Sequence, residues 1–466
     1  LEIAILDPAE THYYQPMWTL IGGGEFPKEK SGRPMQSVIP KGVAWLKEGA
    51  SEFNPDLNSV TTIEGNSYSY DYLVVAAGIQ TDWDQIPGLK EGLGKNGICS
   101  NYSFKTVDYT WECIRGLKEG TAIFTQPVTP VKCGGAPQKI CYLAEDYFRS
   151  RSKVRDKVNV IFASGLDSIF AVPRYRATLE EVIKREEIDA RYSYDLVSLN
   201  PEEKIATFKH LETGETEDVA FDMIHVTPPM SAPDFIKNSP LAAETGWVSV
   251  DKHSLRHTDF ANVYAIGDCS NLPTSKTGAA IRKQAPALVE HLFADIEHRS
   301  SSASYNGYTS CPLVTGYGSL VMAEFDYDKN TITLNVVAVG VLKLTIVLEH
   351  QEDSLASALV SAQHHHHHRN CYNCFADSSG PCRSNDHNGA CFAAVTRPNG
   401  VPGQLYCPAG SHWCDEKEDS AVRVMPSSTY KGSVSKMGEK VEGTVTIDDT
   451  THFDGIIHAH GLKKVD

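Results

Sequence analysis

The stretch that decides the fold is TDFANVYAIGD at residues 258–268, where an apolar strand runs into a glycine and an aspartate. A second apolar strand that ends in glycine, YDYLVVAAG, occupies residues 70–78. Outward from these two, apolar β-branched runs alternate with helical patterns up to about residue 328. Strands that alternate with helices favour parallel sheets, so we expect a doubly wound α/β architecture over this part of the chain.

The end of the first strand is also informative. The sequence opens inside an apolar run, LEIAILDP at residues 1–8, which ends at Asp7. In dinucleotide-binding folds an acidic residue at the end of the second strand binds the ribose, and a glycine-rich turn for the pyrophosphate precedes it by roughly 20 residues. We therefore expect this sequence to start downstream of that turn. Taken alone, Asp7 would be an ordinary turn residue.

These three features resemble, in this order, the motifs of flavoproteins with two dinucleotide-binding domains, and the resemblance implies FAD as the cofactor. Gly267 would bring the backbone close to the cofactor, and Asp268 can bond the ribityl chain. A helix that begins near Thr277 would aim its N-terminal amides at the electron-rich edge of the flavin. The residues expected to contact FAD are Asp7, Ala77, Gly78, Gly267, Asp268, Lys276 and Thr277.

Two of the 12 cysteines stand in segments suited to redox chemistry. Cys133 lies in PVKCGGAPQK at residues 130–139, after a strand and before a helix, where the helix N-terminus and Lys132 would lower the thiol pKa. Cys311 is flanked by tyrosines that could line an aromatic pocket: Tyr305, Tyr308 and Tyr317. We expect inert buried thiols at Cys99, Cys113 and Cys141, and we assign no role to Cys269.

With HYYQPMW at residues 12–18, HVTPPM at 225–230 and GDCSNLPTSKT at 267–277, these segments resemble the sulfide:quinone oxidoreductases of the mitochondrial type over roughly residues 1–328. The resemblance implies that Cys133 and Cys311 are the catalytic pair, linked in the resting enzyme. Sulfide attacks the bridge and leaves a persulfide, expected on Cys311, while Cys133 faces the flavin. Electrons pass through FAD to ubiquinone, and sulfane sulfur passes to an acceptor such as glutathione, sulfite or cyanide.

The same resemblance implies a location on the matrix side of the mitochondrial inner membrane. It predicts an FAD-binding domain of residues 1–105 and 236–328 around a second dinucleotide-like domain, 106–235, that carries Cys133. A linker with a run of histidines would follow at 329–369, and a cysteine-rich, polar tail at 370–466. Because the pyrophosphate turn and the family's C-terminal membrane-docking part are not recognisable, we expect weak or no FAD binding and impaired quinone reduction.

A pyridine-nucleotide-dependent relative, such as an NADH:quinone-type flavoprotein, is the main alternative enzyme. It would need a second glycine fingerprint after a mid-chain strand. At that place VIFASGLDS, residues 160–168, has a single glycine, which disfavours a nicotinamide site. The formal net charge of −16, from 43 basic and 59 acidic residues, disfavours nucleic acid as a partner.

The last part of the chain has a different texture. Residues 331–348 favour a strand pair or a buried helix over a membrane span. Six cysteines between Cys371 and Cys414 favour a disulfide framework over zinc, so we predict no metal site, and residues 370–416 weakly resemble Ly-6-type three-finger domains. A disulfide module and a matrix enzyme do not share a compartment. The alternative function is therefore a cysteine-rich interaction module fused to a non-functional flavoprotein remnant.

Overall fold

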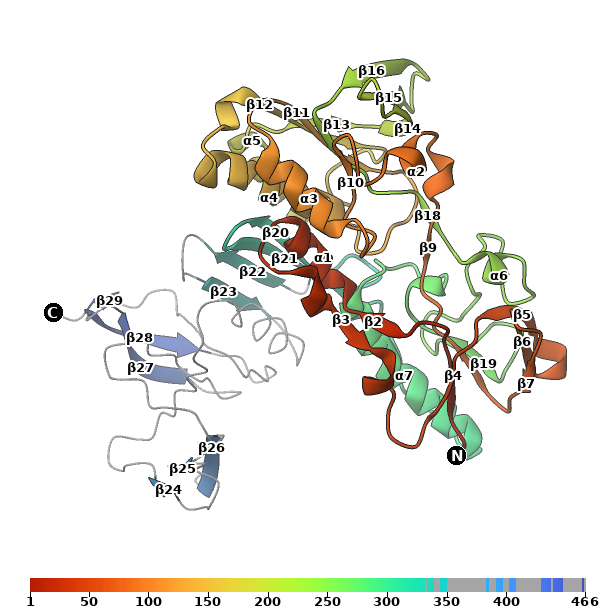
Figure 1. The fold of residues 1–466 in the computed structure, drawn as a ribbon. Coiled ribbons are helices and arrows are strands. Elements are labelled where there is room, and N and C mark those ends of the chain that lie inside the picture. The colour runs from red at the N-terminus through yellow and green to blue at the C-terminus, as the bar shows by residue number, and fades with distance from the viewer. Residues whose placement is uncertain are drawn as a thin grey trace. The chain divides into compact units, whose positions relative to one another are not determined.

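The computed structural model describes residues 1–331 and, beyond them, the backbone of eight strands. The chain forms two compact units, residues 1–331 and 332–466 (Figure 1). The strands described in the second unit are β22 (Thr333–Ala338), β23 (Leu344–Glu349), β24 (Arg383–Ser384), β25 (Cys391–Thr396), β26 (Pro402–Cys407), β27 (Thr429–Lys436), β28 (Glu439–Thr446) and β29 (Lys463–Lys464).

A five-stranded parallel sheet forms the centre of one half of the first unit. Its order is β10 (Ile98–Cys99), β17 (Met223–His225), β11 (Gly120–Gln126), β12 (Val158–Ser164) and β13 (Asp189–Tyr192). The strands β11 and β12 are buried along nearly their whole length, as expected for parallel strands covered on both faces.

The two faces of this sheet bury different layers because side chains alternate along a strand. Phe124 and Phe162 face the helices α3 (Val107–Gly116), α4 (Ala136–Asp146) and α5 (Pro173–Arg185). Ile123 and Ile161 face the antiparallel sheet of β14 (Tyr194–Asn200), β15 (Ile205–His210) and β16 (Thr216–Ala220). Figure 1 shows α3 and α4 side by side along the first of these faces.

The other half of the first unit holds two short parallel pairs. The strand β1 (Ala4–Leu6) pairs with β4 (Ala44–Leu46), and β8 (Leu73–Val75) pairs with β19 (Val263–Ala265). The two sequence stretches that end in glycine thus lie side by side in register. The long helix α7 (Gly278–Ile296) follows β19 and is capped by the Thr277 side chain, which accepts a hydrogen bond from the Ala280 N–H.

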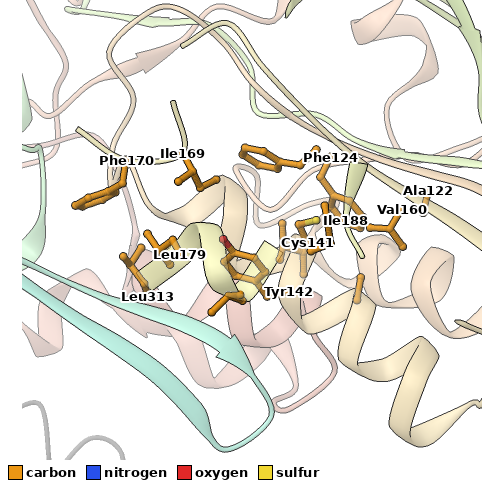
Figure 2. Close-up of a cluster of buried hydrophobic side chains, with 14 of the residues drawn as sticks. Ala122, Phe124, Cys141, Tyr142, Val160, Ile169, Phe170, Leu179, Ile188 and Leu313 are labelled. Carbon is orange, nitrogen blue, oxygen red and sulfur yellow. The ribbon is translucent and has the colours of Figure 1, made fainter. Parts of the chain in front are cut away.

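An antiparallel hairpin of β20 (Thr309–Gly316) and β21 (Ser319–Phe325) packs on α4 and carries Cys311. Figure 2 shows Leu313 of β20 near Tyr142 of α4 and Leu179 of α5, in one buried cluster that also includes Cys311. The hairpin is therefore held by the same apolar core that seats the helices of the parallel sheet.

Shorter elements complete the first unit. They are β2 (Thr11–Tyr13), α1 (Trp18–Gly22), β3 (Gly32–Pro34), β5 (Ala50–Asn54), β6 (Ser59–Thr62), β7 (Ser67–Ser69), β9 (Gln80–Thr81), α2 (Leu89–Gly92), β18 (Met230–Ser231) and α6 (Asp234–Lys237).

The predicted α/β class is confirmed. Of the two alternatives for residues 331–348, a strand pair or a buried helix, the described residues show the first, since β22 and β23 pair antiparallel. In the tail, Cys391 and Cys407 face each other in the register of β25 and β26. Cys371, Cys374, Cys382 and Cys414 lie outside the described residues, as does the histidine run. The disulfide framework, the three-finger resemblance and the domain limits remain predictions.

Candidate active site

The fold brings Cys133 and Cys311 together although 178 residues separate them in sequence. Their sulfur atoms lie 3.3 Å apart, and both thiols are free. Cys133 sits in the turn between β11 and α4, whereas Cys311 is buried on β20. The packing of β20 against α4 is what closes the gap between them.

The Cys133 turn is held in an unusual backbone conformation. Cys133 has φ of +53°, a left-handed conformation that costs a non-glycine residue on the order of 1–3 kcal/mol. Its N–H donates to the Lys276 carbonyl at 2.7 Å, and its carbonyl accepts from the Ala136 N–H at 2.7 Å. The first bond ties the cysteine pair directly to the segment that precedes α7. Strain of this kind persists only where surrounding contacts fix it, as they do here.

Gly135, the N-cap residue of α4, allows the two cysteines to approach. A Cβ at this position would lie 2.8 Å from the Cys311 sulfur and 2.1 Å from the Leu313 Cδ2. By contrast, a Cβ on Gly134 would meet nothing within 4 Å. The close approach of the two cysteines thus depends on the missing side chain at Gly135 and not on that at Gly134.

The two thiols have opposite acidities. The pKa of Cys133 is lowered to about 5, first by the hydrogen bond from Cys311 and then by the Lys139 ammonium, against the effect of burial. The Lys139 Nζ donates to the Cys133 sulfur at 3.4 Å. The pKa of Cys311 is raised well above its ordinary value by the same hydrogen bond, by burial and by negative charge on Cys133. The pair therefore shares one proton, which stays on Cys311.

The cation that lowers the pKa of Cys133 differs from the predicted one. Lys132 was expected to lower it, but its ammonium lies 5.9 Å from the ring centres of Trp18 and Tyr102. Lys139, one turn into α4, provides the cation instead. Sequence distance favoured Lys132, and only the direction of the helix shows which lysine reaches the sulfur.

The predicted flavin-contacting glycines adopt the backbone conformation that glycine allows. Gly78 has φ of +73° and Gly267 has φ of +75°. A Cβ on Gly78 would meet nothing within 4 Å, and Val74 and Ala77, near it at the end of β8, are exposed. Gly278, the first residue of α7, also faces open space. A Cβ on Gly267, by contrast, would lie 3.1 Å from the Ile281 Cδ1, so the open space is at Gly78 and Gly278.

Asp268 and Lys276 are linked through the backbone. The Lys276 Nζ donates to the carbonyls of Asp268, at 2.6 Å, and Ser270, at 2.9 Å. Burial lowers the pKa of Lys276 to about 8 and raises the pKa of the Asp268 carboxyl. Within residues 1–331, no hydrogen bond to the Asp268 carboxylate is seen, so it can accept one from a ligand.

Asp7 has a local role in the structure as well. The Asp7 carboxylate accepts the Ala9 N–H at 2.7 Å in the β1–β4 pair, which is separate from the β8–β19 pair. Asp7 therefore makes the turn contact that the simpler interpretation expected, and its role toward a cofactor remains a prediction.

The remaining cysteines of the first unit are mostly inert. Cys269 is buried, donates to the Val75 carbonyl at 3.4 Å, and has its pKa raised to about 11 by burial. Burial also raises the pKa of Cys99 and of Cys141. Cys113 is different: it is half-buried, and a hydrogen bond from Cys99 lowers its pKa despite the opposing effect of burial.

The hydroxyls of the three tyrosines near Cys311 make hydrogen bonds within the first unit, and their role in lining a pocket remains a prediction. The Tyr305 hydroxyl donates to the Tyr308 carbonyl, and the Tyr308 hydroxyl bonds Glu324. The Tyr317 hydroxyl donates to the Gly23 carbonyl. Each is thus tied into the hairpin or its neighbours. In residues 1–331 and the described strands, no helix is long and apolar enough to cross a membrane, and no cluster of side chains suits a metal ion.

Comparisons with known proteins agree with this geometry. No protein-family model matches the chain. The mitochondrial sulfide:quinone oxidoreductase of Mus musculus is 48% identical over 326 residues, 70% of this chain and 72% of that protein. Its namesake from Dictyostelium discoideum is 47% identical over 331 residues, again 70% of this chain and 72% of the relative.

A solved structure has the same fold. The sulfide:quinone oxidoreductase of the bacterium Aquifex aeolicus aligns with a TM-score of 0.62 at 19% identity, and the alignment covers 70% of this chain and 78% of that one. This alignment shows a shared fold, while the mitochondrial relatives establish kinship. The chain therefore belongs to the mitochondrial sulfide:quinone oxidoreductase family.

Proposed function

We propose that this chain oxidises sulfide at the Cys133–Cys311 pair and delivers two electrons through FAD to a quinone. The observation that carries the proposal is the contact of the two sulfur atoms at 3.3 Å with one acidic thiol beside Lys139. A pair at this distance can form a disulfide after a small adjustment, and a neighbouring cation stabilises the thiolate that a disulfide releases.

The acidities indicate which sulfur is attacked. In thiol–disulfide exchange the thiol of lower pKa leaves faster. Hydrosulfide would therefore attack the Cys311 sulfur of the bridge, so that a persulfide forms on Cys311, the S–S bond breaks and Cys133 leaves as a thiolate beside Lys139. A nucleophilic acceptor then takes the sulfane sulfur and leaves a second thiolate. Loss of two electrons from the two thiolates restores the bridge.

FAD fits the residues at the end of β8 and before α7. The open space at Gly78 and Gly278 and the accessible Asp268 carboxylate suit a flat, polyhydroxylated cofactor. The N-terminus of α7 favours negative charge there. When bound, FAD supplies the two-electron acceptor that passes reducing equivalents on to a quinone. The hydrogen bond from the Cys133 N–H to Lys276 fixes the acidic thiol next to this surface.

The finer assignments follow the family resemblance. They are ubiquinone as the electron acceptor, glutathione, sulfite or cyanide as the sulfur acceptor, and the matrix side of the mitochondrial inner membrane as the location. Supporting them are the mitochondrial relatives at 47–48% identity. The electron acceptor and the sulfur acceptor can each be tested by exchanging one acceptor at a time in the assay.

The decisive experiment uses the full chain with added FAD, sulfide, sulfite and a soluble quinone. The excess of FAD offsets the weak binding expected from the sequence, so we expect slow quinone reduction in the parent, and its loss in Cys133→Ser and in Cys311→Ser. Cys113→Ser is a matched control, because that half-buried thiol lies on α3 and interacts with Cys99 rather than with either cysteine of the pair. Parental rates in both catalytic-pair variants would refute the cysteine mechanism.

An NADH:quinone-type activity is the second candidate to test. Only one glycine, Gly165, follows β12 within residues 160–168, where a nicotinamide site would need a second glycine fingerprint. We expect no quinone reduction when NADH replaces sulfide. Equal rates with NADH and with sulfide would favour the second candidate.

A further inference from the structure

The strand that carries Cys311 packs against the helix that follows Cys133. From Ala136 to Asp146, α4 rises by about 15 Å. From Cys311 to Gly316, β20 advances by about 16 Å, so the two elements have matched lengths. At one end the sulfur atoms lie 3.3 Å apart. A contact at the other end would therefore fix how far β20 can slide along α4.

Such a contact is present at the turn between β20 and β21. The carboxylate of Asp146, the last residue of α4, accepts the Tyr317 N–H at 2.6 Å. Its other oxygen accepts the Ser150 hydroxyl. Position 316 must be glycine for this approach, because a Cβ on Gly316 would lie 2.9 Å from the Asp146 oxygen that faces the turn. Hydrogen bonds to a charged acceptor are stronger than neutral ones, so this bond ties the turn firmly to the end of the helix.

The Tyr317 side chain is held as well. A π-helical turn, Tyr147–Arg151, continues α4, and the Arg151 guanidinium carbon lies 3.5 Å from the centre of the Tyr317 ring. Arg151 also pairs with Glu25 at 2.9 Å. This ion pair is partly exposed and adds little stability by itself, so its effect is to keep the guanidinium over the ring. The Tyr317 hydroxyl donates to the Gly23 carbonyl at 2.5 Å.

Asp146, Arg151 and Tyr317 thus form a clamp on the turn, at the end of β20 away from the cysteines. Within residues 1–331, none of these three residues makes a hydrogen bond to either sulfur. A disulfide needs a sulfur–sulfur distance of about 2.05 Å, so a pair that opens and closes depends on how precisely β20 lies along α4.

We propose that Asp146 is a positioning residue for the redox pair: the clamp that it forms keeps Cys311 within reach of Cys133 whenever the disulfide opens and closes. The inference deepens the proposed function and rests on it for the use of this pair in sulfide oxidation. It assigns to the far end of the hairpin the work of setting the reduction potential of the pair.

The test measures the equilibrium between dithiol and disulfide in the full chain without added FAD. Oxidised dithiothreitol takes two electrons and two protons from the protein dithiol, which gives the protein disulfide and reduced dithiothreitol. After alkylation, mass spectrometry quantifies the linked Cys133–Cys311 peptides. Asp146→Ala should lower the equilibrium constant for disulfide formation about tenfold, because the freed turn lets the sulfurs separate. The reduction potential would then be about 30 mV less negative.

Asp156→Ala is the matched control. Asp156 is an exposed aspartate on the short helix Arg155–Lys157, further along the same segment, and its removal changes the charge equally. Its potential should equal that of the parent. Arg151→Met loosens the clamp from the other side and should shift the potential in the same direction by less, and it decides the matter if Asp146→Ala does not fold. A merely structural role for Asp146 would lower the unfolding temperature and leave the potential unchanged.

The failure of this inference is distinguishable from that of the proposed function. If the parent does not reduce quinone, the potentials alone decide: a less negative potential in Asp146→Ala supports the clamp, and an equal potential overturns it. If the parent is active, we expect Asp146→Ala to lower kcat with KM for quinone unchanged. An equal potential together with parental kcat would then overturn the inference while the cysteine mechanism stands.

Discussion

The substitution Gly135→Ala separates the contact of the two cysteines from every other property of the site. Gly135 has φ of −89° and ψ of −9°, which alanine adopts without strain. The added methyl group is therefore the whole perturbation. It would lie 2.1 Å from the Leu313 Cδ2 and 2.8 Å from the Cys311 sulfur, whereas non-bonded carbon atoms rest at about 3.5–4.0 Å.

The geometry sets the size of the effect. Leu313 is fully buried, so its side chain has little room to turn, and separating its Cδ2 from the new methyl group by an ordinary contact distance takes a shift of at least about 1.4 Å between β20 and α4. Overpacking of this kind costs typically about 1–3 kcal/mol of stability. A displacement of about 1 Å between reacting groups can cost on the order of 100-fold in rate. We expect a loss of activity far larger than the modest loss of stability implies.

The control is Gly134→Ala, the adjacent glycine, whose methyl group would meet nothing within 4 Å. Both variants are assayed for sulfide-dependent quinone reduction, for the rate at which Cys133 and Cys311 form a disulfide under mild oxidation, and for thermal unfolding. Gly134→Ala should follow the parent throughout. Equal disulfide formation and equal activity in the two variants would refute the argument that Gly135 is required for the approach of the cysteines.

Three further outcomes follow from the acidities. Lys139→Met should raise the pKa of Cys133 above about 5, so the acid limb of the pH–rate profile should move to higher pH. Lys139→Arg, which keeps a cation, should leave the acid limb near its parental position. An unmoved acid limb in Lys139→Met would contradict the role of this cation. His225 stays neutral in the fold until about pH 3, whereas the unfolded chain takes up its proton below about 6.5. As the pH falls from about 6.5 to about 3, this group should therefore lower the unfolding free energy by about 1.4 kcal/mol per pH unit. Urea titrations at several pH values should show a shallower pH dependence of the unfolding free energy in His225→Gln. An identical pH dependence in the parent and the variant would contradict the neutral state of His225. Among the cysteines outside the pair, Cys113 should be alkylated by iodoacetamide before Cys99, as mass spectrometry of peptides would show, and the reverse order would be inconsistent with its exposure and lowered pKa.

The sequence determined the strands and their chemistry because local patterns encode them. The alternation of strands and helices predicted parallel sheets, and the segment after residue 267 predicted a helix that begins near Thr277; the parallel pairing of β8 with β19 and the helix α7 confirm these two predictions. Local composition also singled out Cys133 and Cys311 as the candidates for redox chemistry. These features depend on neighbours within one strand or turn, so they can be read without the fold.

The tertiary structure decided which groups act on which. No local rule foretells that Lys139 rather than Lys132 reaches the Cys133 sulfur, since the answer depends on how α4 leaves its turn. Nor does the sequence show that Gly135 makes room for Cys311, because this contact joins segments that are distant in the chain. The sequence by itself thus singled out the two candidate cysteines, and the packing of β20 against α4 decided their distance and their acidities.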